Sequence, residues 1–332
     1  MTLAEPPLLG ADSPVPIDHP FTRSWARGAG VTDRQLADWV AASLLISPMR
    51  GVFHAAQLPD GLELRLACLG VVVPEGAVVT GRTAGWVHGA PMILAPGDHV
   101  CIPHVEMHLP PGSRLRNPLA TGGERSLLGH EVVCIGGIWV TAKLRTTVDL
   151  GRGLRREQAF AAMCAMAKVA DFDEQDLAMA VREHGRFAGY RGIRQARELA
   201  PLVNPKHDSP PECILALAGH DEPGVPCLEP QHPVPSPHGS YFVDLAVPAL
   251  KYGAEYKGAF WHDESRTEAD EQRLAWLVEH EGWIIDEFDD NDVYGPGRDP
   301  GSRLRVGIER ARRRLGGVAW AGQNRAGEPR LG

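Results

Sequence analysis

Hydrophobic and polar positions alternate over two short stretches in the C-terminal third of the chain, 242–247 and 254–258. Alternation with a period of two predicts two β-strands, and the intervening 248–253, which begins with proline and ends with glycine, predicts the turn between them. Residues two apart on a strand share a face. The first strand is therefore expected to point Val243, Leu245 and Val247 to one face and Phe242, Asp244 and Ala246 to the other.

Three charged residues stand on this predicted hairpin. Glu255 and Lys257 share a face of the second strand, and Asp244 can face them across the closed hairpin. Two neighbouring carboxylates repel each other unless a cation lies between them, and Mg²⁺ prefers such oxygen ligands. A lysine beside them can position a water or stabilise charge on a phosphate, as a metal-dependent nuclease requires. Taken alone, the hairpin is also explained by a polar cross-strand pair with a solvated lysine partner.

The front of the chain predicts a winged helix-turn-helix. Its pattern gives a short helix at 21–27, a glycine-rich turn, and a second helix from 33 to about 44. Thr32 is placed to cap the second helix, and Gln35 to complete a capping box. The stretch 46–53 predicts the hairpin that forms the wing.

A winged helix of this kind places its second helix in the major groove of DNA. Arg34 is the only basic residue of that helix, where Asp33 and Asp38 oppose it, and Arg50 is the only basic residue of the wing. The two arginines are therefore the candidate DNA contacts of this region. Whether the region reads DNA or serves as a scaffold stays open at this point.

The middle of the chain, 61–200, predicts a mixed α/β region. A helix is expected at 62–70, strands at 101–109 and 136–141, and four amphipathic helices after them. Pro103 predicts that the first of these strands lies at a sheet edge.

Three side chains that can bind metals alternate along that strand. They are His104, Glu106 and His108. Ligands on one strand face suggest a metal site, but a solvated strand face explains the same pattern and is the favoured interpretation.

Composition limits the class of protein. The 332 residues suggest two domains, and 43% hydrophobic with 23% charged residues is typical of a soluble globular protein. The net charge of −8 means that any nucleic-acid contact has to come from local patches. Six dispersed cysteines without a CxxC spacing predict reduced thiols and a cytoplasmic location. No apolar run approaches a membrane span, and the acidic, proline-rich start lacks the basic region of a secretory signal.

The N-terminal two-thirds of the chain resembles the AbiEi-type antitoxin-like regulators that are abundant in actinobacteria. Three stretches carry the resemblance, at 30–33, 79–89 and 137–150. The resemblance implies that the front domain binds DNA, and it implies a cognate toxin or an operator as a partner.

The remainder resembles the restriction-endonuclease-like, or PD-(D/E)xK, superfamily, and most closely its branch related to very-short-patch-repair endonucleases. The expected element order over 212–315 is αβββαβα. The stretches that carry this resemblance are Ser209 with Glu212, 243–246, 255–258, His262, Asp270 with Arg273, and 282–283. One departure is Val243, which stands where the motif has proline.

This second resemblance implies a metal site. Asp244 and Glu255 would bind Mg²⁺ or Mn²⁺, together with the carbonyl oxygen of Tyr256. Lys257 would orient the attacking water or stabilise the developing charge, and Glu212 would join through a water or a second metal. His262 and Arg273 would contact phosphate.

The expected fold class is thus α/β (α+β), with a winged-helix and mixed α/β front and a restriction-endonuclease-like C-terminal domain. The expected function is a Mg²⁺-dependent DNA endonuclease with a DNA-binding front domain. The alternative is a DNA-binding transcriptional regulator or antitoxin of a type IV toxin–antitoxin system, with an inactive nuclease fold. A protein-interaction module with neither activity is a third possibility. The expected divisions are a disordered tail at 1–20, the winged helix at 21–60, the mixed region at 61–200, a linker at 201–211, the nuclease-like domain at 212–315 and a flexible tail at 316–332.

Overall fold

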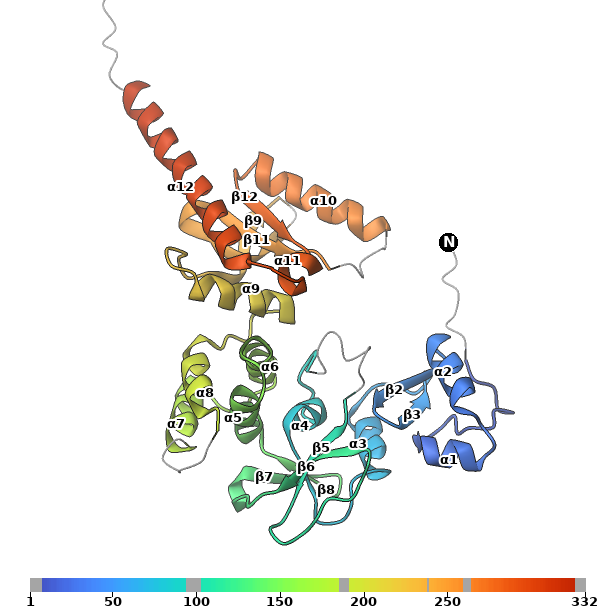
Figure 1. The fold of residues 1–332 in the computed structure, drawn as a ribbon. Coiled ribbons are helices and arrows are strands. Elements are labelled where there is room, and N and C mark those ends of the chain that lie inside the picture. The colour runs from blue at the N-terminus through green and yellow to red at the C-terminus, as the bar shows by residue number, and fades with distance from the viewer. Residues whose placement is uncertain (1–7, 94–102, 185–190, 238, 259–263, 326–332) are drawn as a thin grey trace, which may run out of the picture. The chain divides into compact units, whose positions relative to one another are not determined.

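The computed structural model describes residues 8–93, 103–184, 191–237, 239–258 and 264–325 (Figure 1). The chain forms two compact units. Unit 1 comprises 1–154 and 165–203, and unit 2 comprises 155–164 and 204–332. Both units combine helices with sheets, which confirms the mixed α/β class. Among the described residues, no helix is both long enough and apolar enough to cross a membrane.

Unit 1 begins with a small three-stranded antiparallel sheet and two helices. The strand order is β1-β3-β2. The elements are β1 (Phe21–Thr22), α1 (Arg23–Gly28), α2 (Asp33–Ala41), β2 (Leu45–Met49) and β3 (Val52–Ala55). The capping box at the start of α2 is confirmed, since Thr32 accepts from the Gln35 N–H and Gln35 accepts from the Thr32 N–H. Phe21 opens a strand and not the expected helix, and α2 ends at Ala41, earlier than expected.

The tip of the β2–β3 hairpin packs inside unit 1. Gly51 has a φ of +76°, and a Cβ at this position would lie 2.6 Å from Cδ2 of Leu119. The Arg50 N–H donates to the carbonyl of Pro103 at 2.8 Å. Met49 and Val52, which flank the tip, are buried in the core of the next sheet. The predicted wing is therefore anchored by its own protein.

That next sheet has five strands in the order β6-β5-β4-β8-β7. Pairs β4–β8 and β5–β6 are parallel and the other pairs are antiparallel. The elements are α3 (Leu62–Gly70), β4 (Val78–Val79), α4 (Gly81–Val87), β5 (Val105–Leu109), β6 (Ala120–Glu124), η1 (Gly129–Glu131), β7 (Val132–Ile135) and β8 (Ile138–Thr141). The expectation that Pro103 marks an edge strand is wrong, because β5 pairs with β4 on one side and β6 on the other. Pro103 precedes the strand, so its missing N–H removes no ladder bond.

Helices complete unit 1. They are α5 (Lys143–Gly153), α6 (Arg156–Lys168), α7 (Glu174–His184), α8 (Ile193–Leu199) and the short η2 (Ala200–Leu202). Helix α5 contacts α4, α7 and α8, and its middle is fully surrounded. Helix α6 begins in unit 2 and ends in unit 1.

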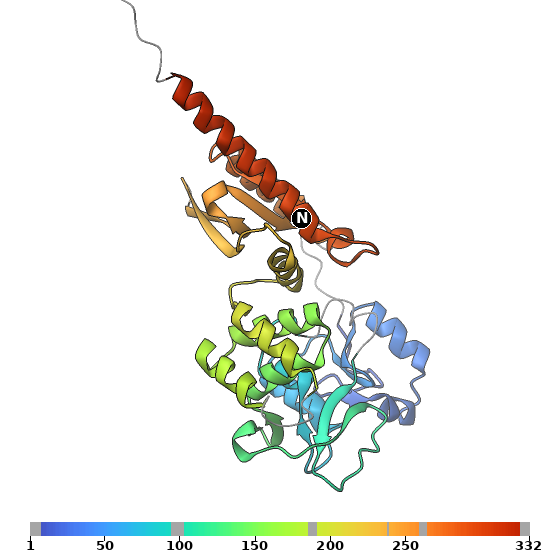
Figure 2. The same ribbon diagram turned by 60° about the vertical axis from the view of Figure 1, so that its left-hand side comes forward.

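Unit 2 is a four-stranded sheet, β12-β11-β10-β9, with helices on both faces (Figures 1 and 2). Only β11 and β12 are parallel. The elements are α9 (Pro210–Asp221), β9 (Glu229–Ser236), β10 (Gly239–Val247), η3 (Pro248–Leu250), β11 (Tyr252–Tyr256), α10 (Glu264–Glu279), β12 (Ile284–Phe288), α11 (Asp290–Tyr294) and α12 (Pro300–Arg325). The order αβββαβα is found, with α11 inserted before the last helix.

The two faces of the sheet have separate cores, and strand β10 contributes to both. Leu245 and Val247 pack with α9 and α12 residues, whereas Val243 packs with Ala246 and with Leu277 of α10. The expectation that Val243 shares a face with Leu245 is wrong. The alternation slips at Asp244, between them, and this slip positions the site described next.

Candidate functional site

The slip in strand β10 has a counterpart in strand β9. The ladder pairs Val243 with His232 and Leu245 with Pro230, but it skips Asp244 and Gln231. Gln231 has a positive φ of 50°, which an L residue rarely adopts. This conformation turns the amide of Gln231 toward two carboxylates. Its Nε2 donates to Oδ1 of Asp244 at 3.2 Å and to Oε2 of Glu212 at 3.1 Å.

Glu212 is held in the first turn of α9. Ser209 caps the helix, and its hydroxyl donates to Oε1 of Glu212 at 2.7 Å. The N–H of Asp208 donates to Oε2 at 2.9 Å. Glu212 is only 5% exposed. Burial, and then the nearby charge of Asp244, raises the pKa of Glu212 to about 7.

Asp244 lies between Glu212 and the second strand of the hairpin. Its Oδ2 accepts the N–H of Tyr256 at 3.0 Å. Burial raises the pKa of Asp244, and the hydrogen bond from Tyr256 opposes that rise. The structure therefore brings Asp244 and Glu212 together around the amide of Gln231, a residue that sequence reasoning did not single out.

Glu255 has a different partner. Its Oε1 and Oε2 accept from Nη1 and Nη2 of Arg273 at 3.1 and 2.7 Å. Arg273, on α10, also donates from Nε to Oδ1 of Asp270 at 2.9 Å and from Nη1 to the carbonyl of Phe242 at 2.8 Å. Burial raises the pKa of Glu255, and the paired guanidinium opposes the rise. Arg273 thus neutralises the carboxylate that was expected to bind metal.

Lys257 points elsewhere. Its Nζ forms an ion pair with Glu287 of β12, and both side chains are nearly half exposed. The hydroxyl of Tyr256 donates to Asp290. The three residues of the predicted Asp–Glu–Lys group therefore have three different sets of partners.

In this arrangement the carboxylates do not fit a shared metal ion. Each described carboxylate oxygen of Glu212, Asp244 and Glu255 already accepts a hydrogen bond from the protein. Over the ranges that the structure describes, no group of three or more His, Cys, Asp and Glu side chains could hold a metal ion. A bound Mg²⁺ would require Gln231 and Arg273 to release their carboxylates. The predicted magnesium site stays a prediction.

The histidine-rich strand has internal partners as well. His104 precedes β5, and its Nε2 lies 3.1 Å from Nη1 of Arg50. Glu106 accepts the N–H of Arg82 at 3.2 Å, and Nδ1 of His108 lies 3.1 Å from the hydroxyl of Thr80. These contacts favour structural roles for the strand.

Of the remaining candidate DNA contacts, Arg34 is the most accessible. Its side chain is 92% exposed, with Asp38 at 4.0 Å. Arg50 lies at the anchored hairpin tip, and His262 falls outside the described residues. Arg27 and Arg23, on α1, both pair with Asp33.

A largely buried ionic network surrounds Asp149 of helix α5 in unit 1, and sequence reasoning missed it. Nε of Arg145 donates to Oδ2 of Asp149 at 2.9 Å, and its Nη1 pairs with Glu131. Arg125 and Arg152 also donate to Asp149, at 3.0 and 2.7 Å. Burial alone would raise the pKa of Asp149, but the three guanidinium charges outweigh burial and lower it. A usable signal was the spacing of Arg145 and Asp149, which places them on one face of an otherwise buried helix.

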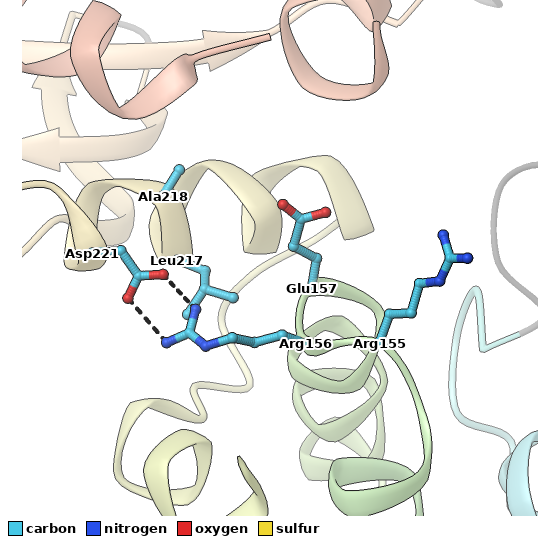
Figure 3. Close-up of a pocket in the computed structure, with 6 residues that line it drawn as sticks. All are labelled: Arg155, Arg156, Glu157, Leu217, Ala218 and Asp221. Atoms are coloured by element: carbon cyan, nitrogen blue, oxygen red, sulfur yellow. Dashed lines mark hydrogen bonds and ion pairs between the residues drawn. The ribbon is translucent and has the colours of Figure 1, made fainter. Parts of the chain in front are cut away.

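A hollow of about 350 Å³ lies elsewhere in unit 2 (Figure 3). It is lined by Arg155, Arg156, Glu157, Leu217, Ala218 and Asp221. Arg156 pairs with Asp221, and Glu157 pairs with Arg298. Because most of its charges are already compensated, the hollow gives no indication of a ligand.

Comparison with known protein families supports the expected AbiEi-like region, and that match does not extend to the expected restriction-endonuclease-like domain. Residues 77–202 match the family model of the AbiEi antitoxin C-terminal domain. Two uncharacterized proteins of Mycobacterium tuberculosis, Rv2248 of strain H37Rv and MT2308 of strain CDC 1551, are each 32% identical to the chain over 287 residues, covering 85% of this chain and 99% of theirs. The chain belongs to the family of these proteins. Alignment over that length includes parts of both units, so the likeness extends beyond the AbiEi-like domain.

The AbiEi-like domain contains the five-stranded sheet, α5, and the ionic network around Arg145. The predicted resemblance of 79–89 and 137–150 to AbiEi regulators is confirmed, because both stretches lie within the matched residues. The match ends at residue 202 and leaves the carboxylate site of unit 2 outside it.

Proposed function

We propose that the protein is a DNA-binding transcriptional regulator that acts as the antitoxin of a type IV toxin–antitoxin system. The match of residues 77–202 to the AbiEi antitoxin C-terminal domain carries this proposal. The proposed divisions are the winged helix at 21–60, the AbiEi-like region at 61–200 and a nuclease-like sheet domain at 212–315. In this proposal the sheet domain is structural, and its partners are an operator and a cognate toxin.

The winged helix would use α2 as its reading helix. Strand order β1-β3-β2 with α1 and α2 supports the winged-helix interpretation, and the Arg34 side chain of α2 is exposed. The wing is not available in the usual way, because Gly51 and Arg50 pack against residues of the AbiEi-like region. Base contacts therefore depend on α2, and phosphate contacts have to come from other parts of the chain.

A mobility-shift titration with the duplex upstream of its own gene tests this proposal. We expect specific binding over a shuffled duplex, weaker binding by Arg34→Ala, and unchanged binding by Arg194→Ala, an equally exposed arginine on α8. Because phosphate contacts release counterions, affinity should fall as salt rises. Equal binding of the operator and the shuffled duplex, or no effect of Arg34→Ala, contradicts the role of α2.

The toxin partnership has its own test. Co-expression of the protein should restore growth to cells that express the toxin gene adjacent to it. A variant with Arg34→Ala separates the two activities, because Arg34 lies outside the matched residues 77–202, so growth rescue should survive the loss of DNA recognition. Failure of the wild-type protein to restore growth would reject the antitoxin role and leave a plain regulator.

Metal-dependent phosphodiester hydrolysis is a second candidate function, and it requires Gln231 and Arg273 to release the carboxylates that they hold in this structure. The observation that favours it is the pair Glu212 and Asp244, two buried carboxyl groups with raised pKa values around one amide, since such groups gather at functional sites. Supercoiled DNA with Mg²⁺ gives the assay. Nicking by the wild type and its loss in Asp244→Asn and Glu255→Ala support this function, and nicking that persists in Glu255→Ala assigns it to a contaminant.

A further inference from the structure

Arginines gather on the last helix of unit 2. Within 303–314, helix α12 carries six of them and a single acidic residue, Glu309. They are Arg303, Arg305, Arg310, Arg312, Arg313 and Arg314. The chain as a whole has a net charge of −8, so this helix is a local positive surface on an acidic protein.

The first three arginines hold the helix to its own unit. Each pairs with a carboxylate of unit 2, in the pairs Arg303–Asp292, Arg305–Glu222 and Arg310–Asp286. Their charges are compensated, and their role is structural.

The next three arginines differ. All three are exposed. The Arg313 side chain is 81% exposed, and its described ion pair is within the helix, to Glu309 at 3.6 Å, a carboxylate that Arg305 shares at 3.1 Å. Nη2 of Arg312 donates to the carbonyl of Gly224 at 3.1 Å, a neutral acceptor, and over the described residues no carboxylate is paired with this guanidinium. Nη2 of Arg314 lies beside the backbone of Gly282. A concentrated positive charge is thus presented to solvent.

Helix α12 leaves the packed core at this point. Its buried stripe of Leu304, Ile308 and Ala311 ends there, and the next position of the stripe, Leu315, is 41% exposed. Both ribbon views show α12 running on beyond the sheet (Figures 1 and 2). The arginine run stands about three turns before the end of the helix at Arg325. The helix dipole acts within the last turn only, so it does not explain these charges.

We infer that the projecting part of α12 binds the phosphate backbone of duplex DNA through Arg312, Arg313 and Arg314. Guanidinium groups bind phosphate through paired hydrogen bonds. Three consecutive helical residues point about 100° apart and together span about 200° of the helix surface. A flat acidic protein surface would contact only one side of the helix and could not reach all three arginines. A helix in the major groove of DNA has a phosphate backbone on either side, so duplex DNA fits this wide span of charge better. The inference rests on the proposed DNA binding and adds the phosphate contacts that the anchored wing does not supply.

The experiment measures affinity for the duplex upstream of the gene between about 50 and 200 mM salt. It compares the full-length wild type, the triple variant Arg312→Gln/Arg313→Gln/Arg314→Gln, and the matched control Arg114→Gln/Arg182→Gln/Arg194→Gln, which removes three exposed arginines from unit 1. A plot of log affinity against log salt has a negative slope, and loss of three phosphate contacts should make it shallower by about 2 to 3. Binding at low salt should weaken about ten-fold or more. The control triple and a triple lysine variant, Arg312→Lys/Arg313→Lys/Arg314→Lys, should keep most of the wild-type slope.

The outcomes separate this inference from the proposed function. If the wild type binds the duplex and the glutamine triple has the same salt slope, the inference that α12 binds phosphate is wrong, while the proposed DNA-binding regulator function is unaffected. An equal loss in the glutamine triple and the control triple also overturns the inference, because net charge alone then explains it. If the wild type binds no duplex at about 50 mM salt, both proposals fail.

Discussion

Arg273 holds Glu255 through two parallel hydrogen bonds, from Nη1 to Oε1 at 3.1 Å and from Nη2 to Oε2 at 2.7 Å. The Glu255 side chain is 6% exposed, so its charge depends on this guanidinium. Removing one partner of a buried pair costs about 3–5 kcal/mol, because the other charge is left uncompensated. We expect Arg273→Met to lower the unfolding free energy of unit 2 by about this amount. Hydrogen exchange of the β10 and β11 amides during urea unfolding measures it.

The same pair provides its own control. Adding Glu255→Gln to the Arg273→Met variant removes the unpaired charge and should recover part of the lost stability. Arg194→Met, at an exposed position on α8, should change stability by less than about 0.5 kcal/mol. If the two substitutions at Arg273 and Glu255 are simply additive, the pair is not coupled and the compensation argument is wrong.

Glu212 gives unit 2 a dependence on pH. Its folded pKa is about 7, above its ordinary value of 4.5. A raised folded pKa stabilises the fold fully below the ordinary pKa, and that stabilisation is lost as pH rises through the folded value. Glu212→Gln cannot ionise, so its stability relative to the wild type should increase by about 1 to 3 kcal/mol between pH 5 and pH 8.

Unfolding of both proteins at several pH values between these limits tests the expectation. Glu183→Gln, at an exposed position on α7, serves as the control and should show no such trend. A difference between Glu212→Gln and the wild type that stays constant from pH 5 to pH 8 would mean that the buried carboxyl keeps an ordinary pKa.

Patterns of residues close together in the sequence predicted many of the helices and strands. They could not predict features that depend on residues far away in the sequence. The capping box of Thr32 and Gln35 depends on residues three apart, and the alternation at 242–247 depends on one strand. The capping box and a strand over 242–247 were found, but the alternation of faces slips at Asp244. The face of Val243 was wrong because it depends on the positive φ of Gln231, a residue of the neighbouring strand.

Long-range partners explain the other differences. Strand β6 is rich in glycine and has no apolar alternation, so no local pattern predicts a strand there or its pairing with β5. The candidate site differs in the same way. Glu212, Asp244 and Glu255 were chosen from the sequence, but their hydrogen bonds to Gln231 and Arg273 were not, because neither contact follows from spacing along the chain.

Substitution of two glycines tests whether the tip of the predicted wing packs against Leu119. Gly51 and Gly30 have similar positive φ values, +76° and +84°, but only Gly51 faces a neighbour, Leu119. Gly30→Ala should therefore cost the conformational strain alone, about 1–2 kcal/mol. Gly51→Ala should cost more, because its Cβ also displaces Leu119. Thermal unfolding of the two variants measures the loss of stability in each. Equal losses of stability would show that the hairpin tip does not pack on Leu119.

The last prediction concerns the contribution of Arg145 to the stability of the AbiEi-like domain. Arg145 is 2% exposed as a side chain and pairs with both Glu131 and Asp149. Arg145→Met should destabilise unit 1 by about 3–5 kcal/mol, since two buried carboxylates lose their shared cation. Arg125 is 26% exposed and pairs with Asp149 at 3.0 Å, so Arg125→Met should cost clearly less. The lowered pKa of Asp149 adds a pH trend of the opposite sign to that of Glu212: its stabilisation is present above the ordinary pKa and is lost as pH falls. Hydrogen exchange of the α5 amides in the two variants gives the comparison, and equal protection in both would reject a central role for Arg145.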